Sequence, residues 1–298
     1  MSLHTGAYNV AGTLLAVSFH GTYDTLRPYL HRYAPFLSRT GIGPGKISLS
    51  PVATGPIPVP ALTGAVCSFP YGSARFHIFR NGDTYESLLT GAEGRAISLL
   101  QSAADFSENR LTLSGSPAEC FLGFDNAMMM AFAFAGATRR TLLLHASAVV
   151  HGGKAYLFLG KSGTGKSTHA RLWQENIPDT TLLNDDNPAL LATAQGPVTA
   201  CGTPWSGKTA CYRNEAYPVG AIVRLSQGAD NTIRRERRIA AFASLLSSCS
   251  TAAWDAAAYQ ACRTAVADVA ASVPLFSLTC RPDAEAARLC AQAVGAHP

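Results

Sequence analysis

The sequence predicts an α/β protein in two parts, a smaller antiparallel β-rich module over residues 1–125 and an α/β domain over residues 126–298. Apolar and polar residues alternate on both sides of Asn81-Gly82, which is typical of a β-hairpin. Between residues 155 and 175, an apolar strand-like run leads into a glycine-rich loop and then a helical stretch. These two patterns indicate the β-rich module and the α/β domain respectively.

The composition excludes several classes of protein. Of the 298 residues 47% are hydrophobic, which excludes a wholly disordered chain, and the length suggests about two domains. The formal net charge is +5, and the 24 Lys and Arg residues are spread along the chain, so a nucleic-acid-binding protein is not expected. The net positive charge still allows anionic small molecules as ligands and acidic proteins as partners.

No segment is typical of a membrane span or a secretion signal. The stretch between Lys46 and Arg75 contains five prolines, and the stretch 239–254 is too short and too rich in Ser. The first nine residues lack the basic and apolar regions of a signal peptide. Eight cysteines are scattered without a C-x-x-C pair, which indicates reduced thiols. We therefore expect a cytoplasmic protein that does not bind a membrane.

In the β-rich module, strands are expected over residues 10–19, 74–88 and 110–113. A short helix broken by prolines is expected over residues 24–37, and the proline-rich segment 44–60 is expected to be a loop or an extended edge.

The segment 125–137 has no charge after Asp125 and is apolar on every side, which predicts a helix buried between the two parts. Its three consecutive methionines, at 128–130, suit the filling of a core, and a ligand-binding lining is the alternative.

A glycine-rich loop follows two apolar runs. The runs 141–150 and 155–159 flank the turn His151-Gly152-Gly153-Lys154. The second run leads into Gly160-Lys161-Ser162-Gly163-Thr164-Gly165-Lys166-Ser167, which fits G-x-x-x-x-G-K-[ST] in full, and a helical stretch follows over 168–175. Strand, loop and helix in this order predict a phosphate-binding loop.

The residue types of this loop suit phosphate. Glycines let backbone N–H groups turn inward, and the helix that begins near Lys166 adds the positive end of its dipole. Lys166 is expected to reach the β- and γ-phosphates, and the Ser167 hydroxyl to ligate Mg²⁺. The alternative is a glycine-rich turn without a ligand. The residues expected to bind the nucleotide are Gly160, Ser162, Gly163, Thr164, Gly165, Lys166, Ser167 and Thr168.

In a second motif, Leu182-Leu183-Asn184-Asp185-Asp186, the first acid lies nineteen residues beyond Lys166. An apolar run that ends in carboxylates is typical of a Walker B strand, which places an Asp beside Mg²⁺. If the strand has ended, both carboxylates can face the phosphate site, one holding the metal and the other accepting a proton from an attacking hydroxyl. The alternative is a loop with two solvated acids.

These motifs resemble HPr kinase/phosphorylase and the related phosphoenolpyruvate carboxykinases. The resemblance rests on a strand pair with a histidine near its start, the loop G-x-S-G-x-G-K-S, and Asp-Asp about twenty residues later. It covers residues 142–225. Uncharacterised bacterial proteins related to HPr kinase show similar Leu-His-Ala-Ser, Asn-Asp-Asp-Asn-Pro and Pro-Trp-Ser-Gly-Lys segments, and that resemblance covers most of the chain.

The resemblance implies a P-loop kinase domain in which residues 162–167 hold ATP. Asp185 would assist Mg²⁺, Asp186 would be the general base, and His145 would lie close to the catalytic carboxylate. A core histidine is the alternative for His145. The C-terminal signature through which HPr kinase engages its protein partner is not recognisable, so HPr is not implied as the acceptor.

Three groups of basic residues could complete the site. Lys208, in the turn-rich segment 202–208, could neutralise charge on a transferred phosphoryl group, or could be an ordinary surface lysine. Arg213 and Arg224 are weaker candidates of the same kind. The cluster Arg234, Arg235, Arg237 and Arg238 is either a solvated face or a contact with ATP or an acidic acceptor.

The expected function is Mg²⁺–ATP-dependent transfer of the γ-phosphoryl group to a hydroxyl, on a Ser of a protein or peptide or on a metabolite. The expected catalytic residues are Asp186, His145 and Lys208, and the expected metal ligands are Ser167 and Asp185. An ATP-gated binding protein without phosphoryl transfer is the main alternative, and an enzyme that phosphorylates a ribosomally made peptide is another. A homo-oligomer is a further possibility.

Overall fold

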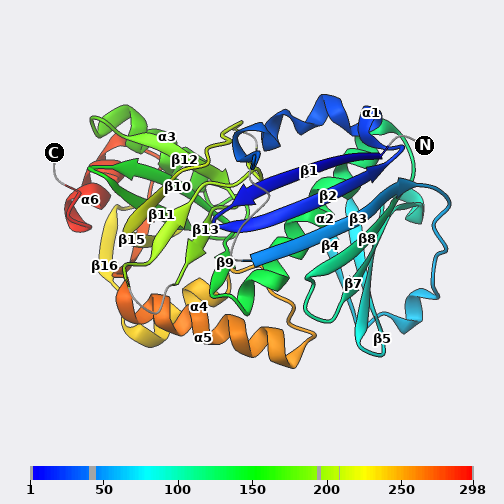
Figure 1. The fold of residues 1–298 in the computed structure, drawn as a ribbon. Helices are drawn as coiled ribbons and strands as arrows, with labels where there is room; N and C mark the ends of the chain where they lie inside the picture. Colours follow the sequence, from blue (N-terminus) through cyan, green and yellow to red (C-terminus); the bar gives the residue numbers. More distant parts are fainter. Residues whose placement is uncertain (1–2, 40–44, 193–195, 208, 297–298) are drawn as a thin grey trace. The chain divides into compact units, whose positions relative to one another are not determined.

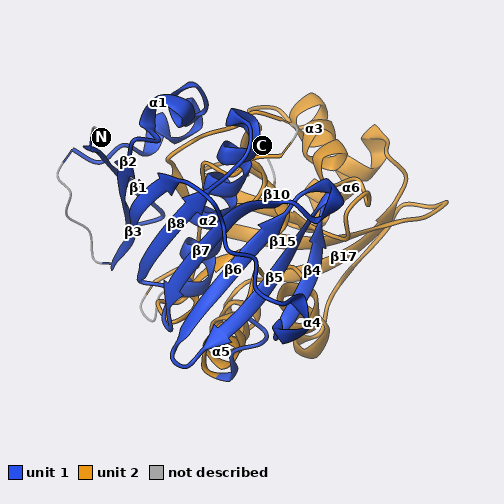
Figure 2. Cartoon of the chain, turned by 90° about the vertical axis from the view of Figure 1, so that its right-hand side faces the viewer, with its two compact units in different colours: residues 1–136, 252–256 blue, residues 137–251, 257–298 orange. Residues whose placement is uncertain are grey.

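The computed structural model describes residues 3–39, 45–192, 196–207 and 209–296. The chain forms two compact units (Figure 2): unit 1 contains Met1–Gly136 and Ala252–Ala256, and unit 2 contains Ala137–Thr251 and Ala257–Pro298. Residues 126–136, which the sequence analysis assigned to the second part, therefore lie in unit 1.

Unit 1 (Figure 1) is built on an eight-stranded sheet with the order β1-β2-β3-β8-β7-β6-β5-β4, which Figure 2 shows face on. Its strands are β1 (Leu3–Val10), β2 (Thr13–His20), β3 (Gly45–Thr54), β4 (Cys67–Tyr71), β5 (Ala74–Asn81), β6 (Thr84–Thr90), β7 (Ala96–Ala103) and β8 (Glu108–Leu113). Its short helices are α1 (Tyr23–Leu26), η1 (Arg27–Phe36), η2 (Leu62–Gly64) and η3 (Ala92–Gly94).

The sheet of unit 1 is mixed, which corrects the expected antiparallel module. Strand β3 pairs parallel to both β2 and β8. Parallel pairing needs a crossover of a dozen or more residues, and the long connection between β2 and β3 supplies it. The expected loop or extended edge over residues 44–60 is corrected for 45–54, which form β3 between two other strands, with Pro51 where the pairing register shifts. Residues 55–60 form neither helix nor strand, as a loop would.

The expected hairpin is confirmed, and its turn lies one residue later than the Asn81-Gly82 pair. Asn81 pairs with Thr84, so Gly82 and Asp83 form the two-residue loop. Gly82 has a φ of 61°, which a type II′ turn requires at its first loop position.

Helix α2 (Pro117–Ala137) contains the expected apolar segment and begins earlier than expected. Its start is a capping box, in which the Ser116 N–H donates to Glu119 Oε2 at 2.8 Å and the Glu119 N–H donates to Ser116 Oγ at 3.4 Å. The helix is long and apolar enough to cross a membrane, but 83% of its most apolar window is buried inside the protein, as in a core helix. Asp125 accepts a hydrogen bond from Tyr33 Oη at 2.6 Å.

The segment 252–256 belongs to unit 1 through two side chains. The Trp254 ring meets the Phe134 ring edge to face at 5.2 Å, and Asp255 accepts a hydrogen bond from Tyr85 Oη at 2.7 Å.

Unit 2 contains a nine-stranded sheet with the path β12-β10-β11-β15-β14-β13-β9, and β17 joins β15 to β16. Its strands are β9 (Thr141–Leu143), β10 (Ala146–His151), β11 (Lys154–Leu159), β12 (Thr181–Asp186), β13 (Ala189–Leu191), β14 (Thr199–Cys201), β15 (Ala216–Gln227), β16 (Thr232–Arg235) and β17 (Leu275–Cys280). Its helices are α3 (Lys166–Asn176), α4 (Arg238–Leu246), α5 (Ala256–Ser272) and α6 (Ala284–Ala293).

Two apolar clusters cover the two faces of this sheet. Helices α4 and α5 contribute Leu245 and Val266 to one cluster, and α3 and α6 contribute Trp173 and Cys290 to the other. Strands β11, β15 and β17 run parallel, so their carboxyl ends lie at one edge of the sheet. In open α/β sheets this edge is where ligands bind.

Candidate functional site

The glycine-rich loop lies between the end of β11 and the start of α3, as the sequence predicts. Gly163 has a φ of 80° and Gly165 a φ of 105°, and no atom lies within 4 Å of a Cβ placed at either position. The glycines are therefore required by backbone conformation, since space for a side chain is available.

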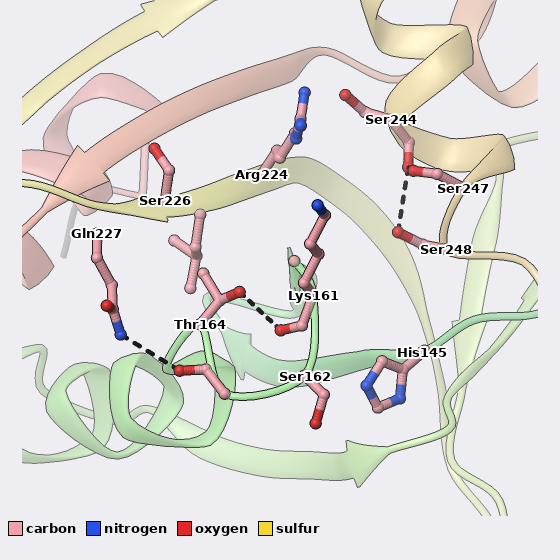
Figure 3. A pocket seen from close by; sticks show the side chains of 13 residues that line it. His145, Lys161, Ser162, Thr164, Arg224, Ser226, Gln227, Ser244, Ser247 and Ser248 are labelled. Atoms are coloured by element: carbon pink, nitrogen blue, oxygen red, sulfur yellow. Dashed lines mark hydrogen bonds between the residues drawn. The ribbon is translucent and has the colours of Figure 1, made fainter. Parts of the chain in front are cut away.

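Hydrogen bonds hold the loop in shape. Thr164 donates from its backbone N–H and its Oγ1 to the Lys161 carbonyl, at 3.1 and 2.6 Å. Gln227, at the end of β15, donates from Nε2 to the Gly163 carbonyl at 3.2 Å (Figure 3). The loop is thus attached both to itself and to the neighbouring parallel strand.

Lys166, the first residue of α3, is 7% exposed. Its Nζ donates to the Gly160 carbonyl at 3.0 Å and lies 2.9 Å from His145 Nε2. Burial lowers the pKa of Lys166, and the carboxylates of Asp186 and Asp185 act in the opposite direction. Both carboxylates are therefore close enough to favour the ammonium form.

His145 connects Lys166 to Asp186. Its Nδ1 lies 3.0 Å from Asp186 Oδ1, while its Nε2 faces the ammonium group. Because an ammonium group only donates, Nε2 accepts, and the neutral ring then carries its proton on Nδ1 and donates it to Asp186. The His145 backbone N–H donates to the Ser248 carbonyl at 2.7 Å, which fixes the start of β10.

The two acidic residues at the end of β12 differ in environment. Asp185 is 3% exposed and accepts a hydrogen bond at 2.7 Å from Ser147 Oγ, on β10. Asp186 is more exposed, and its Oδ2 accepts from Asn187 Nδ2 at 2.9 Å. Pairing of β10 with β12 places Asp185 opposite Ser147 and brings Asp186 beside His145.

Asn184 organises the end of β12, a role that was not predicted from the sequence. It is fully buried, its Oδ1 accepts from the backbone N–H groups of Asp186 and Asn187, and its Nδ2 donates to Thr203 Oγ1 at 3.2 Å. An amide inside an apolar run that leads into two acids is the signal that could have identified it.

The segment that was expected to carry a catalytic lysine also meets this strand end. Ser206 forms a β-bridge with Asp186, and the Gly207 N–H donates to the Asp185 carbonyl at 2.7 Å. A Cβ at Gly207 would lie 2.9 Å from that carbonyl oxygen, so only glycine allows this approach. Lys208 itself lies outside the described residues.

A cavity of about 680 Å³ opens beside the loop (Figure 3). One side is formed by the glycine-rich loop and His145, another by β15, and a third by the serines of α4 and the turn after it. Its charged and polar lining includes Lys161, Ser162, Arg224, Ser226, Gln227 and Ser244. A second hollow of about 420 Å³ lies against α3, where Thr168 and Leu172 contribute to the lining.

The remaining predicted residues lie in the glycine-rich loop and at the start of α3. Ser162 and Ser167 are exposed, and Thr168 is half-buried. His169 is buried, accepts a hydrogen bond from Trp173 Nε1 at 3.2 Å, and has its pKa lowered to about 4 by burial. His169 is therefore a neutral, hydrogen-bonded histidine of the core.

The expected metal residues, Asp185 and Ser167, do not form a complete protein cage. Among the described residues there is no group of three or more His, Cys, Asp or Glu side chains that could hold a metal ion. Mg²⁺ in nucleotide sites is held by one or two carboxylates together with water and substrate phosphates. A buried carboxylate oriented by Ser147 fits that kind of site.

The model of the family described as "SynChlorMet cassette protein ScmC" matches residues 118–282. The chain belongs to the ScmC family. The part matched to the ScmC family begins at the first turn of α2 and includes the glycine-rich loop, His145 and both acids of β12.

The chain was also compared with curated proteins and with solved structures. Comparison with curated proteins gives no match. The solved structure of the HPr(Ser) kinase/phosphatase from Coxiella burnetii is similar with 11% identity and a TM-score of 0.30, over 51% of this chain and 93% of that chain. A TM-score at that level does not establish a shared fold, so the expected P-loop kinase architecture stays a prediction.

Proposed function

We propose that this protein is a Mg²⁺–ATP-dependent kinase that transfers the γ-phosphoryl group to a hydroxyl acceptor. One observation supports it most: the hydrogen-bonded series Lys166–His145–Asp186 lies at the start of α3, beside a loop whose sequence and conformation suit phosphate. It combines a cation for phosphate oxygens with a carboxylate that can accept a proton.

The proposed binding residues fit a nucleotide. The backbone N–H groups of residues 160–167 and the N-terminus of α3 would surround the phosphates, and Lys166 would contact the outer ones. Asp185 and Ser167 would hold Mg²⁺. When bound, Mg²⁺–ATP supplies the activated phosphoryl group and neutralises part of its charge.

In the proposed reaction, Asp186 accepts the proton of the acceptor hydroxyl as its oxygen bonds to the γ-phosphorus. The bond from that phosphorus to the bridging oxygen breaks, and ADP is the leaving group. His145 holds Asp186 Oδ1 and Asn187 holds Oδ2, so the carboxylate is oriented before the acceptor arrives. The charge on the transferred group would be stabilised by Lys166.

A second function, an ATP-gated binding protein, is supported by the contacts of Lys166. Its ammonium group now bonds to His145 and to the Gly160 carbonyl. An ammonium group that turned toward a phosphate would release the imidazole, so nucleotide occupancy could change the conformation around His145 without transfer. The cytoplasmic location and a homo-oligomeric state stay predictions.

The test uses γ-labelled ATP, Mg²⁺ and a cell extract, separated by a small-pore filter, with wild type and Asp186→Asn compared. Asp179→Asn is the matched control, because Asp179 is exposed and has a φ of 55°, which Asn tolerates. Label in retained protein indicates a protein or peptide acceptor, and label in a new small compound indicates a metabolite.

For a kinase, Asp186→Asn abolishes labelling while ATP binding persists, and Asp179→Asn behaves as wild type. ATP binding without any label that depends on Asp186 would overturn the kinase proposal and favour the gated binding protein.

A further inference from the structure

The acid of the candidate site and two arginines stand on one row of the sheet. The pairing registers connect Asp186 to Ala146, Ala146 to Leu159, Leu159 to Arg224, Arg224 to Ser277, and Ser277 to Arg234. Residues directly opposite each other in a sheet point to the same face. Asp186 is at one end of this row and Arg234 at the other.

The arginine end of the row is a polar part of an otherwise apolar sheet face. Ile222 and Leu275 precede Arg224 and Ser277 by two residues and so point to the same face. Both belong to the core under α4 and α5. Further along the same strands the face carries Arg224, Ser226, Ser277 and Thr279, and β16 adds Thr232 and Arg234. These six residues line a hollow of about 440 Å³, which we name the arginine hollow.

The arginine hollow carries two cations that form no ion pair within the described part of the chain. Arg234 donates from Nε to Ser277 Oγ at 3.1 Å, which holds its guanidinium over the row. Across the described residues, neither Arg224 nor Arg234 forms an ion pair with a carboxylate. Glu236 also lines the hollow, and its Oε2 accepts a hydrogen bond from Ser244 at 3.1 Å.

The arginine hollow lies next to the cavity beside the loop. Arg224 and Ser226 line both, and the cavity extends to His145 and carries a third cation, Lys161. A ligand that passes Arg224 and Ser226 would therefore extend from His145 to Arg234 within unit 2, and we call this path the trough.

The length of this trough limits the ligand. Neighbouring strands are about 4.8 Å apart, so Arg224 is three spacings, or roughly 14 Å, from Asp186, and Ser277 is roughly 19 Å away. An extended peptide covers about 3.3 Å per residue, which corresponds to roughly four to six residues. A small metabolite does not reach from Asp186 to Arg224.

The geometry points to a peptide acceptor, with an acidic side chain or C-terminal carboxylate about four to six residues from the phosphorylated hydroxyl and bound by Arg224 and Arg234. This inference rests on the proposed function and specifies its acceptor. Guanidinium groups bind carboxylates through paired, charge-assisted hydrogen bonds, which suits an anion between two arginines.

Synthetic peptides test the distance. Each carries one Ser and one Glu, separated by two to ten residues on either side in a neutral background, and a Gln peptide matches each Glu peptide. Phosphorylation from Mg²⁺–ATP is measured with wild type, Arg224→Gln and Arg234→Gln. Arg235→Gln is the matched control, because Arg235 pairs with Phe276, which packs on the opposite face of the sheet.

We expect the highest kcat/KM when Glu lies four to six residues from Ser, with a KM about 10- to 100-fold higher for Gln peptides. Arg224→Gln and Arg234→Gln should remove this preference and leave the KM for ATP unchanged, while Arg235→Gln keeps both. Phosphorylation without preference for Glu, or a preference that survives Arg234→Gln, would overturn the inference and leave the kinase proposal intact. A raised KM for ATP would assign the arginines to the nucleotide and overturn it too.

Binding provides a readout independent of transfer. The same peptides, labelled with a fluorophore, are titrated with wild type and the three arginine variants, and Kd is read from anisotropy. If no peptide is phosphorylated, the kinase proposal fails on these acceptors, and the Kd values decide the inference. Equal Kd values for Glu and Gln peptides would overturn it, and a weaker Kd only for the Gln peptides and for the variants of Arg224 and Arg234 would support it.

Discussion

Asp186 and His145 meet at 3.0 Å, from Oδ1 to Nδ1, although one residue ends β12 and the other precedes β10. The two strands that carry them are neighbours in the sheet, so the contact is set by strand pairing. The other nitrogen of the same imidazole faces Lys166. Different replacements of His145 should therefore remove the contact with the carboxylate or the contact with the ammonium group.

Two replacements of His145 separate these effects. Asn keeps an N–H donor near the position of Nδ1, and Gln keeps a polar group near Nε2. For the kinase, we expect His145→Asn to retain more turnover than His145→Gln, which should lose about 10- to 100-fold because Asp186 is no longer held. The measurement is kcat together with the Kd for ATP. Equal losses in kcat would contradict a positioning role for Nδ1.

Replacement of Gly207 by Ala should disturb the acidic strand end. A Cβ there would lie 2.9 Å from the Asp185 carbonyl oxygen and 3.2 Å from Asp186 Cβ. We expect a loss of stability of about 1–3 kcal/mol from overpacking, together with reduced turnover. Gly64→Ala is the control, because a Cβ at Gly64 meets nothing within 4 Å. Thermal unfolding and turnover measure the two effects, and a Gly207→Ala protein as active as the control would contradict the expectation.

Replacement of Gly165 by Ala tests the backbone of the loop. Its φ of 105° is unfavourable for any residue with a Cβ, although the space beside it is open. We expect the Kd for ATP to rise by at least about tenfold, since relaxing the loop turns its N–H groups away from the phosphates. Gly152→Asn, in the β10–β11 turn where φ is 55°, should leave the Kd unchanged. An unaltered Kd for Gly165→Ala would contradict the phosphate role of the loop.

Asp125 predicts a pH dependence of stability in unit 1. Burial raises its pKa to about 6, from 3.8, against the hydrogen bond from Tyr33 and the charge of Arg32. Because the folded-state pKa is raised, its stabilising contribution is fully present below about pH 4 and is lost as the pH rises through about 6. The free energy of unfolding of wild type should therefore fall relative to Asp125→Asn over this range.

Urea unfolding between pH 4 and pH 7 measures that difference. Asp83→Asn, in the exposed turn of the β5–β6 hairpin, should follow wild type at every pH. A difference between wild type and Asp125→Asn that stays constant with pH would show that Asp125 does not titrate as expected.

Local sequence patterns were sufficient for the elements around the loop. The turn at Gly152-Gly153, the start of α3 near Lys166 and the carboxylates at the end of β12 all depend on neighbouring residues, and the structure places them as expected. They could be predicted because glycine conformation and apolar periodicity act over a few residues.

Features that depend on strand order could not be predicted. The position of β3 inside the sheet was missed because Pro51 is typical of an edge, and a register shift accommodates it instead. The row from Asp186 to Arg234 requires six strands in a specific order and register. The role of Asn184 was missed because its partner Thr203 comes from a different segment of the chain.

The route of the chain between the two units determines what a gene fragment for unit 2 alone would lack. The chain leaves unit 2 after Thr251, contributes Ala252–Ala256 to unit 1, and returns for α5. Ser248, just before this excursion, holds the backbone of His145. A gene fragment that encodes unit 2 alone would therefore need a replacement for these five residues, which follow Ser248 closely in the sequence.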